Sequence, residues 1–315
     1  MSCIYKGEVV DTDLSSNARG GTEMMRERLL QHVPADLLQN FAIHFSRPRE
    51  IYSDVKNIFF AHDLATDPEN AILQGDGWKQ FEKFVFVSYW QRDQYIMMHG
   101  IPYSKCAVIE NAIEMEYSVT QKSTDVVRFI YHTTPHRGLE LLYPIFDALS
   151  KEFSNIHLEV FSSFEIYGWK ERDKAYLDLF SKLSNHPNIT YYGTQSNDTV
   201  LAALKNSHIF LYPCIWQETS CIAMIEAIRA GCLVIHPTLA ALPETASTAT
   251  IMYDYHEDPS VHANIAYRAA RTVLNIQKND PAFINNFTNN VAAELPRNSI
   301  QGFKSKWINL LEQVK

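Results

Sequence analysis

The chain has no hydrophobic run long enough to cross a membrane. The longest apolar stretches among its 315 residues, such as HIFLYPCIW at 208–216, fall short of the roughly 20 residues that a spanning helix needs. Pro213 interrupts this one. The N-terminus, MSCIYKGEVVDTDLSS, lacks the apolar segment of a signal peptide. We therefore expect a cytoplasmic protein without a transmembrane segment.

Long basic tracts and closely spaced cysteines are also missing. The net charge is −8, so the sequence gives no strong sign of nucleic-acid binding. The five cysteines form no C-x-x-C pair, which argues against both a zinc site and a disulfide framework. We expect reduced thiols at all five positions, Cys3, Cys106, Cys214, Cys221 and Cys232.

No G-x-G-x-x-G string follows an apolar run, which makes a nicotinamide-dependent oxidoreductase improbable. The content of 46% hydrophobic and 20% charged residues is that of an ordinary globular protein. A chain of 315 residues is too long for one core of ordinary size. The sequence therefore predicts two domains.

Short apolar runs alternate with amphipathic stretches along the whole chain, which predicts an α/β fold with parallel sheets. A polar segment at 117–125 separates two such sets and is interpreted as a linker. Strands are predicted at 41–46, 57–62, 83–88 and 106–111, then at 128–132, 157–161, 189–192, 208–212 and 232–236. Helices are predicted at 138–152, 170–184, 197–206, 219–230, 260–275 and 299–314.

These patterns give the domain boundaries. We expect an N-terminal Rossmann-like acceptor domain at 1–117 and a C-terminal Rossmann-like donor domain at 124–298. The last helix, at 299–315, is expected to return and pack on the first domain, because Phe303 and Trp307 lie on its apolar face.

The most informative segment is 210–244, where a strand runs into a loop and then into a helix. The free N–H groups and positive dipole end at such a helix N-terminus suit a diphosphate. Glu218 is predicted just before the helix and Glu226 two turns into it, with Thr219 and Ser220 in its first turn. The simpler alternative is a pair of solvated helix glutamates.

A second polar loop, TTPHRG at 133–138, follows a predicted strand. Thr133 and Thr134 offer hydroxyl donors, and Arg137 offers a guanidinium fork for phosphate oxygens, with a helix opening near Gly138. The alternative for Arg137 is a surface residue. His132 and His136 have near-ligand spacing, but no cysteine or carboxylate cluster joins them, so a metal site is not favoured.

Two segments of the N-terminal half carry polar chemistry. Gly20 and Gly21 precede the helical pattern that begins at Thr22, and paired glycines allow a close backbone approach to a phosphate or sugar. His62 follows a predicted strand. The alternatives are a simple turn for the glycines and a structural role for the histidine.

Several of these strings together resemble the retaining GT-B glycosyltransferases of family 4. Glu218 and Glu226 match the family's E-x7-E signature, with Pro213, Ala227, Gly231, Pro243 and Glu244 at the accompanying positions. The string VIENAIE at 108–114 resembles V-I-x-N-G-I-D, with Ala112 for Gly and Glu114 for Asp. The resemblance implies two Rossmann-like domains that face each other across a cleft.

The resemblance also implies roles for individual residues. Glu218 would contact hydroxyls of the donor sugar, Glu226 the ribose, and Arg137, in place of the family's usual Lys, the diphosphate. His62 would lie near the reacting sugar. We take His62, Glu218 and Arg137 as catalytic, and the donor-binding set as Gly20, Gly21, Thr22, Thr133, Thr134, Arg137, Gly138, Gly193, Pro213, Glu218, Ser220, Cys221, Ile222 and Glu226.

The resemblance implies a retaining hexosyltransferase that needs no metal and no cofactor. Its donor would be a UDP- or GDP-sugar, its acceptor a glycan, a lipid-linked sugar or another group, and its state a monomer or homodimer. Two alternatives remain open. One is a sugar-nucleotide epimerase of the same architecture, and the other is a non-catalytic protein that binds sugar nucleotides.

Overall fold

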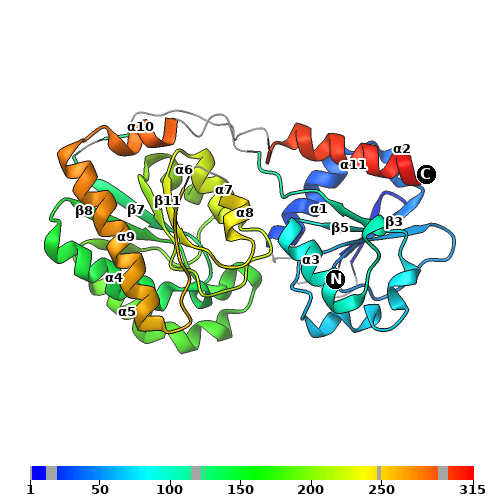
Figure 1. Cartoon of the computed structure of the whole chain (residues 1–315), viewed down its shortest axis with the longest axis horizontal. Coiled ribbons are helices and arrows are strands. Elements are labelled where there is room, and N and C mark those ends of the chain that lie inside the picture. The colour runs from blue at the N-terminus through cyan, green and yellow to red at the C-terminus, as the bar shows by residue number, and fades with distance from the viewer. Residues whose placement is uncertain (1, 12–19, 115–121, 124, 247–249, 290–296) are drawn as a thin grey trace. The chain divides into compact units, whose positions relative to one another are not determined.

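The structure is a computed structural model, and it describes residues 2–11, 20–114, 122–123, 125–246, 250–289 and 297–315. The described residues form two compact units. The first comprises those of Met1–Glu114, Glu218–Ser220 and Pro296–Lys315, and the second those of Met115–Gln217 and Cys221–Leu295. Both are α/β units, as the sequence predicted, and each is built on a six-stranded sheet (Figure 1).

The first sheet has the order β2-β1-β3-β4-β5-β6. Its four parallel strands are β3 Phe41–Phe45, β4 Lys56–Phe60, β5 Lys83–Phe86 and β6 Cys106–Val108. Each begins within a residue of a predicted strand. The core beneath them is aromatic, because Phe59, Phe81, Phe84 and Phe86 are buried together with Tyr95.

The expectation of a purely parallel sheet is wrong at one edge of this unit. β1 Ser2–Tyr5 and β2 Glu8–Asp11 form an antiparallel hairpin, and β1 also pairs antiparallel with β3. The turn between them consists of Lys6 and Gly7, which both have positive φ angles, 49° and 79°. Two such residues match the right-handed twist of the flanking strands and so favour a tight hairpin.

The helices of the first unit include its last segment of chain. They are α1 Gly21–His32, α2 Ala35–Leu38, α3 Tyr89–His99 and α11 Ile300–Val314, with short 3-10 turns at Pro68–Leu73, Gly77–Gln80 and Tyr103–Lys105. α11 packs against α1 and α2, as Figure 1 shows. Its buried Trp307 contacts the ring of Phe60 at a centroid distance of 5.0 Å, so this helix completes the first unit.

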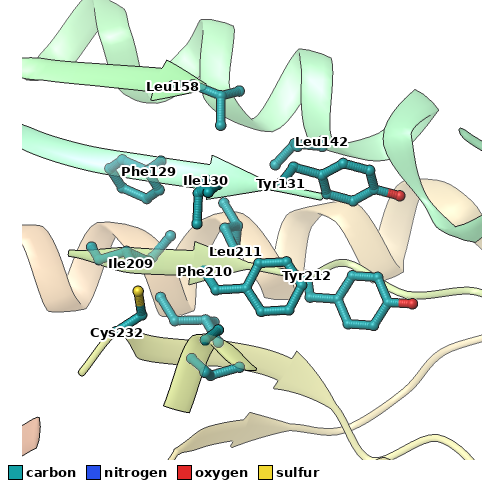
Figure 2. Close-up of a cluster of buried hydrophobic side chains, with 14 of the residues drawn as sticks. Phe129, Ile130, Tyr131, Leu142, Leu158, Ile209, Phe210, Leu211, Tyr212 and Cys232 are labelled. Carbon is teal, nitrogen blue, oxygen red and sulfur yellow. The ribbon is translucent and has the colours of Figure 1, made fainter. Parts of the chain in front are cut away.

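The second sheet is parallel throughout, with the order β12-β11-β10-β7-β8-β9. Its strands are β7 Val127–Tyr131, β8 Ile156–Val160, β9 Ile189–Tyr191, β10 Ile209–Leu211, β11 Leu233–Pro237 and β12 Ile251–Tyr253. The sequence did not predict β12, which has only three residues and an exposed Met252 at its centre. Figure 2 shows the core side chains of β7 and β10, which lie next to each other in the sheet.

The helices of the second unit are α4 Leu139–Glu152, α5 Leu177–Asn185, α6 Asn197–Asn206, α7 Ile222–Arg229, α8 Leu242–Ala246, α9 Pro259–Asn279 and α10 Phe283–Asn289. α9 packs along α4 (Figure 1). The single helix predicted at 170–184 is instead a 3-10 segment, Lys170–Tyr176, followed by α5, with a further 3-10 turn at Phe164–Tyr167. Within this 3-10 segment the buried carboxylate of Asp173 accepts hydrogen bonds from Ser163 Oγ and the Phe164 N–H, which tie it to the preceding 3-10 turn.

Most of the predicted linker at 117–125 lies outside the described residues. Its described end is fixed to the second unit. Lys122 Nζ donates to the backbone carbonyls of Ser207 and Gly231, and His208 Nε2 lies 2.7 Å from the carbonyl of Ser123. A hinge at the linker would therefore have to lie before Lys122.

No helix in the described part of the chain is both long and apolar enough to span a membrane.

Candidate functional site

The loops that follow β7 and β10 leave the second sheet at the same edge, because these two parallel strands are neighbours. In Figure 2, Tyr131 and Tyr212 mark the carboxyl ends of the two strands. The hydroxyls of Thr133 and Thr134 are buried in the first of these loops and have no hydrogen-bond partner among the described residues. A polar ligand at this edge would satisfy them.

Gly138 brings the two loops together. Its φ of 126° suits glycine, and a Cβ built at this position would lie 2.2 Å from the carbonyl oxygen of Pro213. The N–H of Ile215 also donates to the carbonyl of Arg137 at 3.3 Å. The structure thus places Arg137, Gly138 and Pro213, which the sequence selected from separate motifs, in one small region.

His136 is held between two aromatic side chains of this edge. Its ring stacks on Phe164 at 5.2 Å and meets Trp216 edge-on at 4.7 Å. Burial, with added repulsion from Arg137 and Arg172, lowers the pKa of His136 to about 4. Two guanidinium groups therefore act on this loop, and the sequence analysis had selected only Arg137.

The helix that was predicted to span 219–230 begins later. α7 starts at Ile222 with Cys221 as its N-cap, so Thr219 and Ser220 lie in the preceding loop and not in its first turn. An α-helix leaves its first N–H groups without intrahelical partners, and in α7 these groups begin at Ile222. Glu226 lies within α7, whereas Glu218 precedes it in the sequence.

Glu226 is a buried carboxylate on α7, with 6% of its surface exposed. Its Oε2 lies 4.0 Å from Nδ1 of His132, whose side chain is only 3% exposed. Burial lowers the pKa of His132 to about 4, so the imidazole next to Glu226 is uncharged at neutral pH. The interpretation of Glu226 as a solvated surface residue is therefore wrong. Glu218 is also buried, at 5% exposure.

Gly193 follows β9 with a positive φ of 64°. The hydroxyl of Thr194, the next residue, is buried without a partner among the described residues. Sequence reasoning selected Gly193 but missed Thr194, His132 and Arg172. The one available signal for His132 was its position directly before Thr133. The sequence analysis considered this histidine only as a possible metal ligand.

In the first unit, Gly20 and Gly21 form the start of α1. Gly20 is the N-cap with an extended backbone (φ −85°), and its N–H donates to Oε2 of Glu23 at 2.8 Å. Gly21 and Thr22 are the first two helical residues. The backbone conformation of Gly20 therefore does not demand a glycine. Ala18 and Arg19, which precede them, lie outside the described residues.

His62 follows β4 in the first unit. Its ring lies 4.2 Å from that of Phe60 and stacks on Phe45 at 5.9 Å, and its backbone N–H donates to Ser46 Oγ. Burial lowers the pKa of His62 to about 3. Its Nε2 has no hydrogen-bond partner among the described residues. The ring is therefore a neutral imidazole that can take up one further hydrogen bond.

No group of three or more His, Cys, Asp or Glu side chains in the described ranges is arranged to hold a metal ion.

Comparison with known proteins connects the second unit to one enzyme family. Residues 113–255 match the family model of Glycosyl transferases group 1. A curated relative, one of the subunits of the phosphatidylinositol N-acetylglucosaminyltransferase of Arabidopsis thaliana, is 21% identical over 199 residues. This match covers 62% of the chain but only 42% of the plant protein.

Solved structures extend the likeness to both units. A glycosyltransferase of Rickettsia africae superposes with a TM-score of 0.63 at 14% identity, over 97% of this chain and 84% of that one. HepE of Anabaena in complex with UDP-glucose superposes with a TM-score of 0.61 at 13% identity, over 82% of this chain and 72% of that one. TarM superposes with a TM-score of 0.61 at 13% identity, over 84% of this chain and 51% of that one. The chain therefore has a GT-B fold, and its residues 113–255 are similar to the family of Glycosyl transferases group 1.

Proposed function

We propose that the chain is a retaining, metal-independent glycosyltransferase of family 4, which transfers a sugar from a UDP- or GDP-sugar to an acceptor. The observation that carries the proposal is the carboxyl edge of the second sheet. There the contact of Gly138 with Pro213 joins the two loops, beside the buried hydroxyls of Thr133 and Thr134. This edge lies within the residues that match the glycosyltransferase family.

The second unit would bind the nucleoside diphosphate. The N–H groups at the start of α7, from Cys221 and Ile222, and the guanidinium of Arg137 would bind the diphosphate, with Thr133 and Thr134 donating from their hydroxyls. Glu226 would bind the ribose hydroxyls. Carboxylates accept such bonds strongly when they are buried, as Glu226 is.

The sugar would be bound by residues named from the family resemblance. Glu218 would accept hydrogen bonds from its hydroxyls, His62 would lie near the reacting carbon, and Gly20, Gly21 and Thr22 would approach the diphosphate through their backbone. The neutral state of His62, which follows from its lowered pKa, suits a hydrogen bond to an uncharged hydroxyl.

The chemistry would be a transfer with retention. The acceptor would attack the face of the sugar that the diphosphate leaves, and the growing negative charge on the diphosphate would be stabilised by the dipole of α7 and by Arg137. In this proposal Glu218 and Glu226 bind the donor, so they do not form the acid–nucleophile pair that a glycosidase uses.

Metal independence is the part of the proposal that the sequence challenges most directly. One D-x-D triplet exists, Asp11-Thr12-Asp13, and paired carboxylates of this kind are ligands that a divalent cation can use. Thr12 and Asp13 lie outside the described residues. Activity should survive EDTA and also survive in Asp13→Asn. Loss of activity in EDTA that magnesium or manganese restores would overturn metal independence.

The function is tested by donor binding followed by transfer. UDP-, GDP- and ADP-sugars are compared by thermal shift and calorimetry, and the tightest donor is supplied in labelled form with glycan and lipid-linked acceptors. We expect acceptor-linked sugar whose anomeric configuration, read by NMR, equals that of the donor. Inversion would refute retention, and release of free nucleotide without acceptor-linked sugar would favour an epimerase.

A further inference from the structure

His62 is held by its backbone at the point where two strands of the first sheet end. β3 and β4 pair as far as Phe45 and Phe60, and the N–H of Ser46 still donates to the carbonyl of Phe60 at 2.8 Å. Beyond this bond, the side chain of Ser46 takes the place of a strand. Its Oγ accepts hydrogen bonds from the N–H groups of His62, at 2.8 Å, and of Asp63, at 3.2 Å. Ser46 therefore binds the residue that the proposed function puts near the reacting carbon.

The backbone of Ser46 is strained. Ser46 and Arg47 are consecutive residues other than glycine, and both have positive φ angles, 53° and 27°. Such angles crowd Cβ against the backbone, so they persist only where the surroundings enforce them, and they gather at functional sites. The enforcing contacts here are the two bonds to Ser46 Oγ and the bond from Arg47 Nε to Oδ2 of Asp63 at 2.8 Å. The strained turn after β3 is thus bonded to the loop that carries His62.

The ring of His62 is held by the last residues of the same two strands. It stacks on Phe45 at a centroid distance of 5.9 Å and lies 4.2 Å from the ring of Phe60, and both phenylalanines are buried. Nε2 of His62 is buried without a hydrogen-bond partner among the described residues. Because the neighbouring rings restrict the imidazole, the position of Nε2 depends on the backbone position that Ser46 fixes.

Other side chains hold the rest of this loop. Gln91 Nε2 donates to the carbonyl of Asp63 at 2.9 Å, and Asn70 Nδ2 donates to the carbonyl of Leu64 at 2.8 Å. These bonds do not involve Ser46, so the loop should keep its fold when the Ser46 hydroxyl is removed. The loss of that hydroxyl should then act on the N–H groups of His62 and Asp63.

We propose that Ser46 is a positioning residue for His62: its Oγ fixes the His62 backbone, so that Nε2 meets the transferred sugar in one orientation. The proposal rests on the proposed function, in which His62 lies near the reacting carbon. A side chain that fixes a catalytic group in this way acts on turnover more than on donor binding, because a small displacement already misaligns the reacting groups.

Two substitutions of Ser46 separate positioning from stability. Ser46→Ala and Ser46→Gly both remove Oγ, but glycine tolerates the positive φ and alanine does not. Ser46→Gly should therefore have a higher urea midpoint than Ser46→Ala. If Ser46 were only structural, the more stable Ser46→Gly would also be the more active variant. If Ser46 positions His62, both variants are equally impaired.

The readout is sugar transfer with the donor and acceptor that the test of function selects. Both variants should lower kcat about tenfold. The Kd of the donor, measured by calorimetry, should change by less than about twofold, because His62 acts at the reacting carbon. Ser299→Ala is the matched control, since the Ser299 hydroxyl also accepts a backbone N–H in the first unit, that of Gly302 at 3.1 Å. It should leave kcat unchanged.

A double variant tests whether Ser46 acts through His62. Adding Ser46→Ala to His62→Ala should cause little further loss of kcat, because both changes act through one side chain. Wild-type kcat in Ser46→Ala, a kcat in Ser46→Gly close to that of wild type, or losses that add in the double variant would each overturn the proposal.

Failure of the proposed function gives a different result, namely that wild type transfers sugar to none of the acceptors. Amide hydrogen exchange then tests the link itself. Both Ser46 variants should speed exchange of the His62 and Asp63 N–H groups about tenfold, as expected for the loss of a buried hydrogen bond. The N–H of Ala61, which donates to the Val85 carbonyl at 2.8 Å, should exchange as in wild type. Equal protection of His62 in wild type and both variants would show that Ser46 does not hold it.

Discussion

The carboxyl edges of the two sheets differ in how their polar groups are satisfied. In the first unit, Arg47 pairs with Asp63 at 2.8 Å and with Asp67 at 3.0 Å, so the charges that follow β3 and β4 bind one another. In the second unit, the hydroxyls of Thr133 and Thr134 are buried without a partner in the described part of the chain.

A buried hydroxyl that makes no hydrogen bond costs about 1–3 kcal/mol, so a fold keeps several of them together where a ligand or water completes the bonding. A closed ion network needs no such completion. The difference supports the proposal that the nucleoside diphosphate binds at the second unit. The first unit also has buried atoms that lack a partner among the described residues, such as His62 Nε2, Asn70 Oδ1 and Asn111 Oδ1, so the contrast concerns the residues that follow β3 and β4 and the pair that follows β7.

Low pH should produce the largest difference in stability between the two units. Burial lowers the pKa of His132, His208 and His236, all in the second unit, to about 4. In the first unit it lowers the pKa of His62 to about 3, so the prediction rests on the larger number of such histidines described in the second unit. Each binds a proton more readily when unfolded, so stability is full above the unfolded pKa of 6.5 and falls as the pH drops toward 4. Each group can contribute up to about 1.4 kcal/mol per pH unit in this window.

Urea unfolding followed by hydrogen exchange across this pH range checks the prediction, and the second unit should lose protection faster than the first. His236→Gln should reduce the slope for the second unit, because it removes one of these buried histidines. Equal pH dependence of the two units would contradict the comparison.

Gly138→Ala should give the largest loss of any single substitution at the second edge. Its Cβ would overlap the carbonyl of Pro213, and the φ of 126° is strained for alanine, so we expect roughly 2–4 kcal/mol of destabilisation in urea unfolding. Gly75→Ala is the control, because Gly75 has φ of 60° but nothing within 4 Å of its Cβ position. Equal losses of stability in Gly138→Ala and Gly75→Ala would show that the contact with Pro213 does not cause the destabilisation.

Glu226→Gln should weaken nucleotide-sugar binding by about 1–3 kcal/mol, the range for a lost charge-assisted hydrogen bond. The side chain keeps its size and its burial, so the free energy of unfolding should change much less. Calorimetry measures the affinity for the nucleotide sugar, and urea unfolding measures the free energy of unfolding. The exposed Glu257→Gln serves as the control. An unchanged Kd for every sugar nucleotide that binds wild type would refute the ribose assignment.

Asp67→Asn should have the smallest effect. It removes one partner of Arg47, but these groups are partly exposed, and an asparagine can still accept the bond from the Glu69 N–H. We expect a loss below about 1 kcal/mol and no change in nucleotide affinity. A large fall in affinity would mean that the first unit's ion network belongs to the donor site after all.

The sequence anticipated the architecture well where hydrophobic periodicity is strong. Apart from β12, the parallel strands of both sheets lie close to their predicted ranges, as do α4, α6 and α11, because buried strands and amphipathic helices leave clear patterns. It failed where short-range patterns are weak. β12 has three residues, and the hairpin of β1 and β2 depends on the backbone of Lys6 and Gly7 more than on any hydrophobic alternation.

For the candidate site, the sequence by itself determined which residue types are present: Glu218, Glu226, Arg137 and the Thr133–Thr134 pair stand in strings that resemble one family. Only the tertiary structure decided that α7 begins at Ile222, that Gly138 touches Pro213, and that His132 lies beside Glu226. His132 and Glu226 are far apart in sequence, and their side chains meet only in the folded unit. A contact of that kind follows from packing in three dimensions and leaves no local signal in the chain.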